Sequence, residues 1–333
     1  MVRLGYVLSS EEHGPLDLVR AAARAEQAGF TTAWISDHFH PWIGQQGQSP
    51  FVWAVIGGIA QATQRLRVGT GVTCPTMRLH PAIVAQAAAT AATMLPGRFF
   101  LGVGSGENLN EHVLGDRWPP ADTRLEMLEE AVAVIRLLWQ GGTHSHHGRH
   151  YTVENACLYT LPDRLPPIYV SALGPKAVEV AARIGDGYIG TSPESELVAA
   201  YTTRAGPDKP RMGGMKVCWA ADESDARRTA FRLWPNIALP GELAQQLPTV
   251  AHFEQAVRMV SEDKICGTIP CGPDPERHLA SIRQYAEAGY DEVYVHQIGP
   301  DQEGFCRFYE REVLPRIGVR PNPQGSAEGG DEA

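Results

Sequence analysis

The residues of this chain best suited to chemistry are clustered between Ser36 and Trp42. The sequence there is Ser-Asp-His-Phe-His-Pro-Trp, and it follows a short apolar run at 32–35 that is typical of a buried strand. His38 can exchange a proton near neutral pH, and the face of Trp42 can cover a flat ligand. This combination at a strand end indicates the mouth of an active site. The alternative is that Asp37 and His38 are a satisfied strand-end pair and that Trp42 is a surface anchor.

A second candidate region is rich in glycine and ends in acidic residues. Residues 102–111 read Gly-Val-Gly-Ser-Gly-Glu-Asn-Leu-Asn-Glu. Glycines let a flat ring approach the backbone closely while Glu107 projects toward it. Segments 171–175 and 190–192 are small or hydroxylated and precede expected helices, so their amides and hydroxyls can hold a phosphate. The alternative for the glycine run is a tight turn that binds nothing.

The elements that must position these residues alternate almost from end to end. A (β/α)₈ TIM barrel is predicted, because eight apolar strand candidates are each followed by an amphipathic helical pattern. The competing doubly wound sheet lacks a G-x-G-x-x-G after its first strand. In a barrel the strand ends meet at one mouth, which brings Glu11 of the first strand end to the two clusters. The predicted strands are 2–8, 32–36, 66–72, 99–103, 167–171, 187–190, 215–220 and 292–296.

Two segments break the alternation, and we expect one domain over 1–318. Residues 141–160 alternate in polarity and predict a β-hairpin outside the barrel, whereas 236–270 predicts a mixed helical and irregular insertion. Residues 319–333 lack apolar periodicity and are predicted to be disordered. Prolines at 15, 50, 81 and 175 mark expected helix starts.

The overall composition excludes several classes of partner. The 333-residue chain has a net charge of −9, which argues against nucleic acid and anionic membranes as partners. No signal peptide or membrane span is evident, and six scattered cysteines predict reduced thiols in a cytoplasmic protein. Four histidines in 143–150 suggest a metal site. The preferred interpretation is a solvated hairpin tip whose histidines have no carboxylate or cysteine partner nearby, so no metal is expected.

Three motifs together resemble the luciferase-like flavin and deazaflavin oxidoreductases, and more narrowly the coenzyme F420-dependent glucose-6-phosphate dehydrogenase group. The resemblance runs from residue 1 to about residue 195, is loose through 236–270 and returns in the last strand and helix. The motifs are the 36–42 segment, Thr-Cys-Pro-Thr-Met-Arg at 73–78 with His-Pro-Ala-Ile-Val-Ala-Gln at 80–86, and 96–111.

The resemblance implies hydride transfer from an alcohol carbon to carbon five of the deazaflavin ring. It makes His38 the general base and Glu107 the acid that serves a ring nitrogen, while Trp42 and Glu11 shape the substrate side and steady the charge. It also implies a non-proline cis peptide at Gly71-Val72 and a homodimer. The implied cofactor- or ligand-contacting positions are Asp37, Gly71, Val72, Cys74, Ser105, Gly106, Glu107, Asn110, Ala172, Leu173, Gly174, Thr191 and Ser192.

One departure from the resemblance bears on the substrate. Where the glucose-6-phosphate enzymes place a phosphate-gripping lysine, this chain has Thr-Ser-Pro-Glu at 191–194, and Glu254-Gln255 replaces a second one. Each lost charge-assisted contact is worth about 1.5–3 kcal/mol. An uncharged alcohol or ketone is therefore expected, as in the related deazaflavin secondary-alcohol dehydrogenases. The alternatives are an FMN-dependent monooxygenase on the same fold and a non-catalytic ligand-binding relative.

Overall fold

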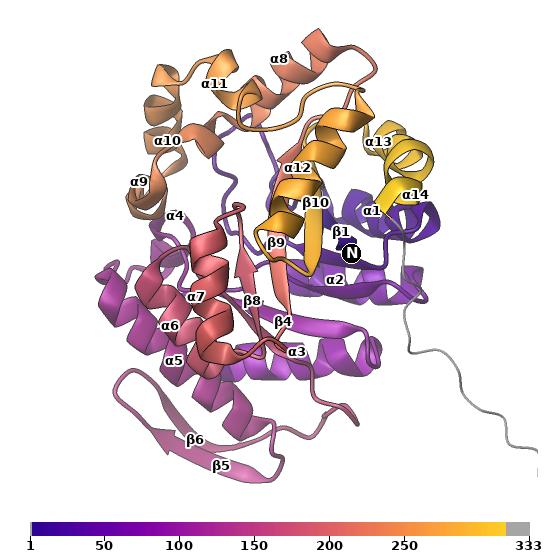
Figure 1. The fold of residues 1–333 in the computed structure, drawn as a ribbon. Helices are drawn as coiled ribbons and strands as arrows, with labels where there is room; N and C mark the ends of the chain where they lie inside the picture. The colour runs from indigo at the N-terminus through magenta and orange to yellow at the C-terminus, as the bar shows by residue number, and fades with distance from the viewer. Residues whose placement is uncertain (1, 318–333) are drawn as a thin grey trace, which may run out of the picture.

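The structure, a computed structural model, describes residues 2–317 and is built around a closed barrel of eight parallel strands (Figure 1). Around the barrel the order is β1-β10-β9-β8-β7-β4-β3-β2, so that β2 closes onto β1. The predicted (β/α)₈ barrel is confirmed, and the doubly wound alternative is wrong because a doubly wound sheet has two open edges. The strands are β1 (Arg3–Leu8), β2 (Thr32–Ile35), β3 (Arg67–Thr70), β4 (Phe99–Val103), β7 (Ile168–Ser171), β8 (Gly187–Gly190), β9 (Arg211–Val217) and β10 (Glu292–Gln297).

Helices surround the barrel and begin largely where proline predicts. Pro15, Pro81 and Pro175 are the first residues of their helices. The prediction for Pro50 is wrong, because Phe51 is still extended as the N-cap and the helix starts at Val52. The main helices are α1 (Pro15–Ala28), α2 (Val52–Ala62), α3 (Pro81–Met94), α5 (Ala121–Leu138), α6 (Pro175–Ile184), α7 (Ser195–Ala205), α8 (Glu223–Leu233), α12 (Pro275–Glu287), α13 (Gln302–Phe308) and α14 (Leu314–Ile317).

Strand β9 begins four residues earlier than the predicted segment 215–220. Gly213 and Gly214 interrupt the alternation of apolar residues that marks a strand in the sequence. Both glycines nevertheless belong to the strand, because larger residues would not fit there. A Cβ at Gly213 would lie 2.5 Å from the Tyr285 ring, and one at Gly214 would lie 3.0 Å from Trp34. The glycines thus make room for large side chains packed against the strand.

Large side chains fill the inside of the barrel and form the floor of its mouth. Trp34 and Tyr294 stack with ring centroids 4.0 Å apart and planes 1° from parallel. Phe100 completes this layer and requires Gly69, where a Cβ would meet the ring at 2.3 Å. The interior cluster consists of Val7, Trp34, Phe100, Tyr169, Ile189, Met212 and Tyr294. Because side chains alternate along a strand, residues two and four positions beyond these point into the mouth.

The predicted hairpin is present as the two-stranded antiparallel sheet of β5 (Thr143–His147) and β6 (Thr152–Cys157), separate from the barrel. The expectation that its histidines have no carboxylate partner is wrong. Helix α5, distant in sequence, places Glu130 3.1 Å from His146 and Glu126 3.5 Å from His150. These pairs attach the hairpin to α5. Across residues 2–317, no group of three or more potential metal ligands is assembled.

The predicted insertion lies over the mouth of the barrel and is attached to it. In Figure 1 its helices α9 and α10 lie near α4 (Asn108–Glu111) at one end of the molecule. Gly44 donates its backbone N–H to Glu254, and Asn108 donates to the carbonyl of Gln246. The insertion comprises η2 (Pro235–Ala238), α9 (Gly241–Gln246), α10 (Val250–Ala256), η3 (Val257–Met259) and α11 (Glu262–Cys266).

The remaining predictions concern the tail, membrane spans and cysteines. The predicted tail at 319–333 and the domain boundary at 318 lie outside the described residues. Within 2–317, no helix is both long and apolar enough to cross a membrane. All six cysteines fall in the described part of the chain and are free thiols.

Candidate active site

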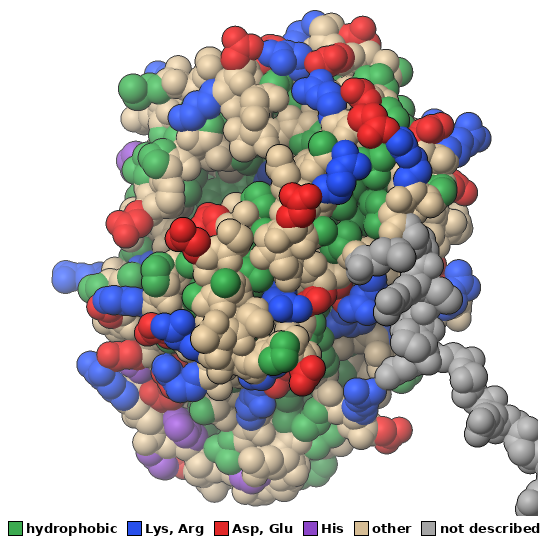
Figure 2. All heavy atoms as spheres, in the orientation of Figure 1, with side chains coloured by type: hydrophobic (Ala, Val, Ile, Leu, Met, Phe, Trp, Pro, Cys, Tyr) green, Lys and Arg blue, Asp and Glu red, His purple; other side chains and the backbone are tan. Residues whose placement is uncertain are grey.

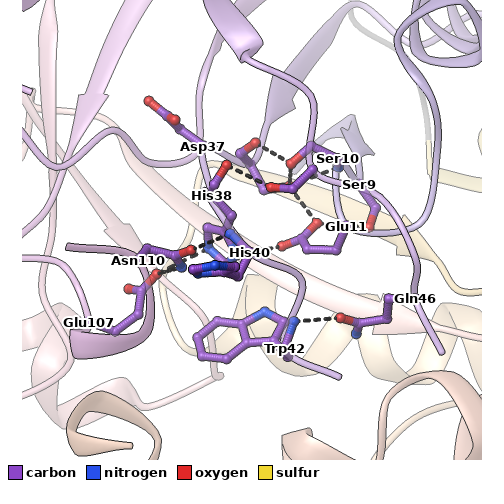
Figure 3. Close-up of polar contacts among 12 residues, drawn as sticks. Ser9, Ser10, Glu11, Asp37, His38, His40, Trp42, Gln46, Glu107 and Asn110 are labelled. Atoms are coloured by element: carbon purple, nitrogen blue, oxygen red, sulfur yellow. Dashed lines mark hydrogen bonds and ion pairs between the residues drawn. The ribbon is translucent and has the colours of Figure 1, made fainter. Parts of the chain in front are cut away.

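His38 lies between two carboxylates at the mouth of the barrel (Figure 3). Its Nδ1 is 3.2 Å from Glu11 Oε1, and its Nε2 is 3.3 Å from Glu107 Oε1. The three side chains come from the ends of β1, β2 and β4, which the barrel brings together. The structure therefore assembles three of the predicted catalytic residues within contact distance, each nitrogen of the imidazole facing a different acid.

Glu11 is the buried member of this group. Its carboxylate is 3% exposed and accepts hydrogen bonds from Ser36 Oγ at 2.6 Å and Ser9 Oγ at 3.0 Å. Burial alone would raise the pKa of Glu11, but His38, the Ser36 hydroxyl and His296 together lower it below its usual value. Glu11 is thus held as an anion, ready to stabilise positive charge on the imidazole.

Glu107 is the more accessible acid, and Asn110 fixes its position. Asn110 donates its amide to Glu107 Oε1 at 2.7 Å, while its carbonyl oxygen accepts the backbone N–H groups of Phe39 and His40, both at 2.8 Å. One buried amide therefore ties the β2 loop that carries His38 to the β4 loop that carries Glu107. Asn110 was predicted as a cofactor contact, and its observed bonds also give it a positioning role.

Trp42 forms the wall of the site on the side of the insertion. Its ring meets His38 edge to face, with centroids 5.0 Å apart, and meets Phe253 of α10 in the same way at 5.2 Å. Gln46 accepts the Trp42 backbone N–H at 2.8 Å (Figure 3). The space-filling view shows the surface hollowed beneath the insertion, with hydrophobic side chains in the hollow (Figure 2). The site thus has an apolar wall on one side and the two acids on the other.

Asp37 is bound within the protein. Its carboxylate accepts Arg78 Nη2 at 2.8 Å and Thr73 Oγ1 at 2.7 Å, so both oxygens are engaged. Arg78 also lies 3.6 Å from buried Glu111. Burial raises the pKa of Glu111 to about 7, with Arg78 opposing the effect and Glu107 adding to it. Arg78 belongs to the 73–78 motif, but the sequence did not show that its side chain links two loops through Asp37 and Glu111.

The ends of β3 and β4 pack closely together through glycines and form one wall of the site, which we call the glycine wall. A Cβ at Gly104 would lie 2.8 Å from Val72, and one at Gly106, where φ is +74°, would lie 2.6 Å from Cys74 Sγ. The Gly71–Val72 peptide is cis, as the resemblance implied. Ser105 is partly buried beside these glycines. Because Gly104 and Gly106 carry no side chains of their own, a flat aromatic cofactor can approach the backbone at this wall, so the residues present fit such a group.

The remaining predicted contacts lie at the ends of β7 and β8. Ala172 is buried, Leu173 is 52% exposed and Gly174 is the N-cap of α6. Thr191 is exposed, and the Ser192 hydroxyl donates to the nearby Glu194 carboxylate at 2.7 Å. The β7 end therefore offers the backbone amides of a helix start, whereas the β8 end carries an acid.

Sequence reasoning missed a second histidine–acid pair in the mouth. Glu12 lies 3.1 Å from His296 Nε2 and accepts the Trp234 indole N–H at 2.6 Å. The adjacent acids Glu11 and Glu12 thus serve two different histidines. The signal was the Glu-Glu-His at 11–13, whose second acid could be assigned only once β10 was placed beside β1.

The Luciferase-like monooxygenase family model matches residues 2–292. The chain belongs to the luciferase-like family. Its curated relatives include proteins named F420-dependent glucose-6-phosphate dehydrogenase from Microbacterium testaceum, 35% identical, and Beutenbergia cavernae, 36% identical. Each match covers 96% of this chain and 98% of the relative.

Two solved structures show the same architecture. An F420-dependent secondary alcohol dehydrogenase, in complex with an F420-acetone adduct, superposes with a TM-score of 0.89 at 31% identity, covering 96% of this chain and 99% of that one. A coenzyme F420-dependent tetrahydromethanopterin reductase from Methanopyrus kandleri, at 21% identity and a TM-score of 0.77, shares the fold. The predicted family is thus confirmed.

Proposed function

We propose that this protein is a coenzyme F420-dependent oxidoreductase that transfers hydride between an alcohol carbon and the deazaflavin. The observation that carries the proposal is His38 held between Glu11 and Glu107 beside the glycine wall of β3 and β4. Relatives over nearly the whole length of the chain carry F420-dependent dehydrogenase names. When bound, the deazaflavin supplies a two-electron hydride acceptor.

His38 acts as the general base in this proposal. The substrate hydroxyl gives its proton to an imidazole nitrogen as the hydride leaves the same carbon, so the alcohol becomes a ketone or aldehyde. Glu11 stabilises the resulting imidazolium at 3.2 Å, because it is a buried anion. Glu107 would deliver a proton to a nitrogen of the cofactor ring, which would neutralise the one negative charge that the hydride brings. Trp42 confines the substrate and excludes water from this side.

We propose an uncharged alcohol or ketone as substrate in preference to glucose 6-phosphate. Glu194 occupies the end of β8 and engages Ser192, and Glu254 engages the backbone at Gly44. Both acids lie in the segments where the resemblance leads us to expect a phosphate-binding lysine. A carboxylate there cannot make the charge-assisted contact that a sugar phosphate needs. The Ser192 hydroxyl also donates its hydrogen bond to the Glu194 carboxylate, so it is not free to bind an anion.

We further propose that two copies pair through α2 and α3. These helices line a largely apolar surface groove of about 290 Å³, where Phe51 and Ile83 are more than half exposed. A self-associating face of this kind matches the expected homodimer. A cytoplasmic location stays a prediction.

A spectroscopic titration tests the proposed function. The purified protein is titrated with oxidised F420 and, in parallel, with FMN, and then given 2-propanol, other simple alcohols or glucose 6-phosphate. Tight F420 binding with bleaching by an uncharged alcohol is the expected result. Bleaching by glucose 6-phosphate alone would refute the substrate proposal. FMN binding with oxygen-dependent turnover would indicate the monooxygenase alternative, and F420 binding without redox activity the non-catalytic one.

A further inference from the structure

The strand register places Lys216 inside the mouth of the barrel. On β9, Met212 belongs to the interior cluster and Gly214 faces Trp34, so Lys216, two residues further, points inward as well. Lys216 is directly paired in register with His296 of β10. A cation thus stands above the barrel floor, in the same layer as the second histidine–acid pair.

Lys216 has no fixed polar partner. Its Nζ lies 5.0 Å from the centre of the Trp234 ring, whose indole is held by Glu12. Within residues 2–317, Nζ makes no hydrogen bond and lies within 4.0 Å of no carboxylate. By contrast, Lys176 binds Asp122, and Lys209 donates to the carbonyl of Gly185 at 2.6 Å.

Two acids, Glu11 and Glu12, lie near Lys216, but neither forms an ion pair with it. Burial lowers the pKa of Lys216, and the charges of Glu11 and Glu12 oppose this effect. Nζ is not one of the buried polar atoms that lack a partner within residues 2–317, so water reaches it from the mouth. An ammonium group with three N–H donors and no fixed acceptor can exchange that water for a ligand oxygen. Two anionic neighbours disfavour an anionic ligand group and favour a neutral oxygen.

We propose that Lys216 is a substrate-binding residue that donates a hydrogen bond to a second, uncharged oxygen of the substrate, next to the carbon that reacts at His38. This deepens the proposed function and rests on it. The substrate class is then a vicinal diol, a hydroxy ketone or another polyhydroxylated compound, in preference to a simple alkyl alcohol. Trp234 and Trp42 would hold the carbon skeleton, and Lys216 would select the oxygenated end.

The test compares two substrates with one carbon skeleton, 1,2-propanediol and 2-propanol, in wild type, Lys216→Met and Lys209→Met. Methionine is one atom shorter than lysine and can still pack on Trp234, but it cannot donate a hydrogen bond. The control, Lys209, lies before β9 at the opposite end of the barrel and donates to backbone carbonyls.

Lys216→Met should lower kcat/KM for the diol by about 10- to 100-fold, as expected for loss of a charged hydrogen bond. It should change kcat/KM for 2-propanol by less than about threefold, and Lys209→Met should leave both values near wild type.

Equal losses on both substrates would overturn the proposal, because Lys216 would then act through the charge of the whole site. So would an unchanged value for the diol. A calorimetric titration of 1,2-propanediol into F420-loaded protein separates this inference from the proposed function. Binding to wild type but not to Lys216→Met, in a protein that bleaches no F420, would support Lys216 and refute the redox function. Equal binding to both proteins would refute the role of Lys216.

Discussion

Replacing Glu11 with glutamine tests whether the buried carboxylate stabilises charge on His38. Glutamine keeps the shape and can still accept a hydrogen bond from Ser36, which lies 2.6 Å from Glu11 Oε2. What is lost is the anion 3.2 Å from His38 Nδ1. A hydrogen bond to a charged group contributes about 1.5–3 kcal/mol. If that stabilisation is realised only when the imidazole is protonated, kcat falls by about 10- to 150-fold.

The assay is single-turnover loss of the oxidised deazaflavin absorbance with a saturating secondary alcohol. The matched control is Glu292→Gln, which removes another buried carboxylate, 2% exposed, at the opposite end of the barrel, where it pairs with Arg3 and Arg67. That variant is expected to lose stability but to keep kcat within about twofold of wild type, because it lies far from the hydride-transfer step. A Glu11→Gln enzyme that binds F420 and retains full kcat would refute the charge-stabilising role of Glu11.

Three further changes have defined outcomes. Asn110→Ala frees Glu107 and the β2 loop, so kcat should fall about 5- to 30-fold while the protein stays folded, as steady-state kinetics and circular dichroism can check. Native Glu111, with its pKa raised to about 7, keeps a proton that the unfolded chain releases above about pH 4.5. The free energy of unfolding should therefore fall by up to about 3 kcal/mol between pH 5 and 8, and urea unfolding of Glu111→Gln should show a flatter profile. Ile83→Glu, in the groove of α2 and α3, should yield a monomer by light scattering, and a persistent dimer would contradict that interface.

The sequence predicted the barrel because its signals are local. Apolar runs, amphipathic helices and prolines such as Pro81 each depend on neighbouring residues only. The errors fall where packing overrides the local pattern. Gly213 and Gly214 read as a break in a strand, yet they are strand residues because Tyr285 and Trp34 need the space.

The site was predicted as a list of strand ends and not as a geometry. His38 and Glu107 could be placed together because all barrel strand ends meet at one mouth. The partners of Asp37 could not be predicted, because its hydrogen bond with Arg78 joins two loops that are 41 residues apart in sequence. Lys216 carried no motif, and its position inside the mouth follows from the register of β9 against β10.

The measurement that tests the central claim most directly is F420 reduction by His38→Ala. The variant should bind F420 as wild type does, because the glycine wall of β3 and β4 is untouched. Loss of a general base should slow deazaflavin bleaching by an alcohol about 10²- to 10⁴-fold. Full turnover by His38→Ala would contradict the assignment of His38 as the base.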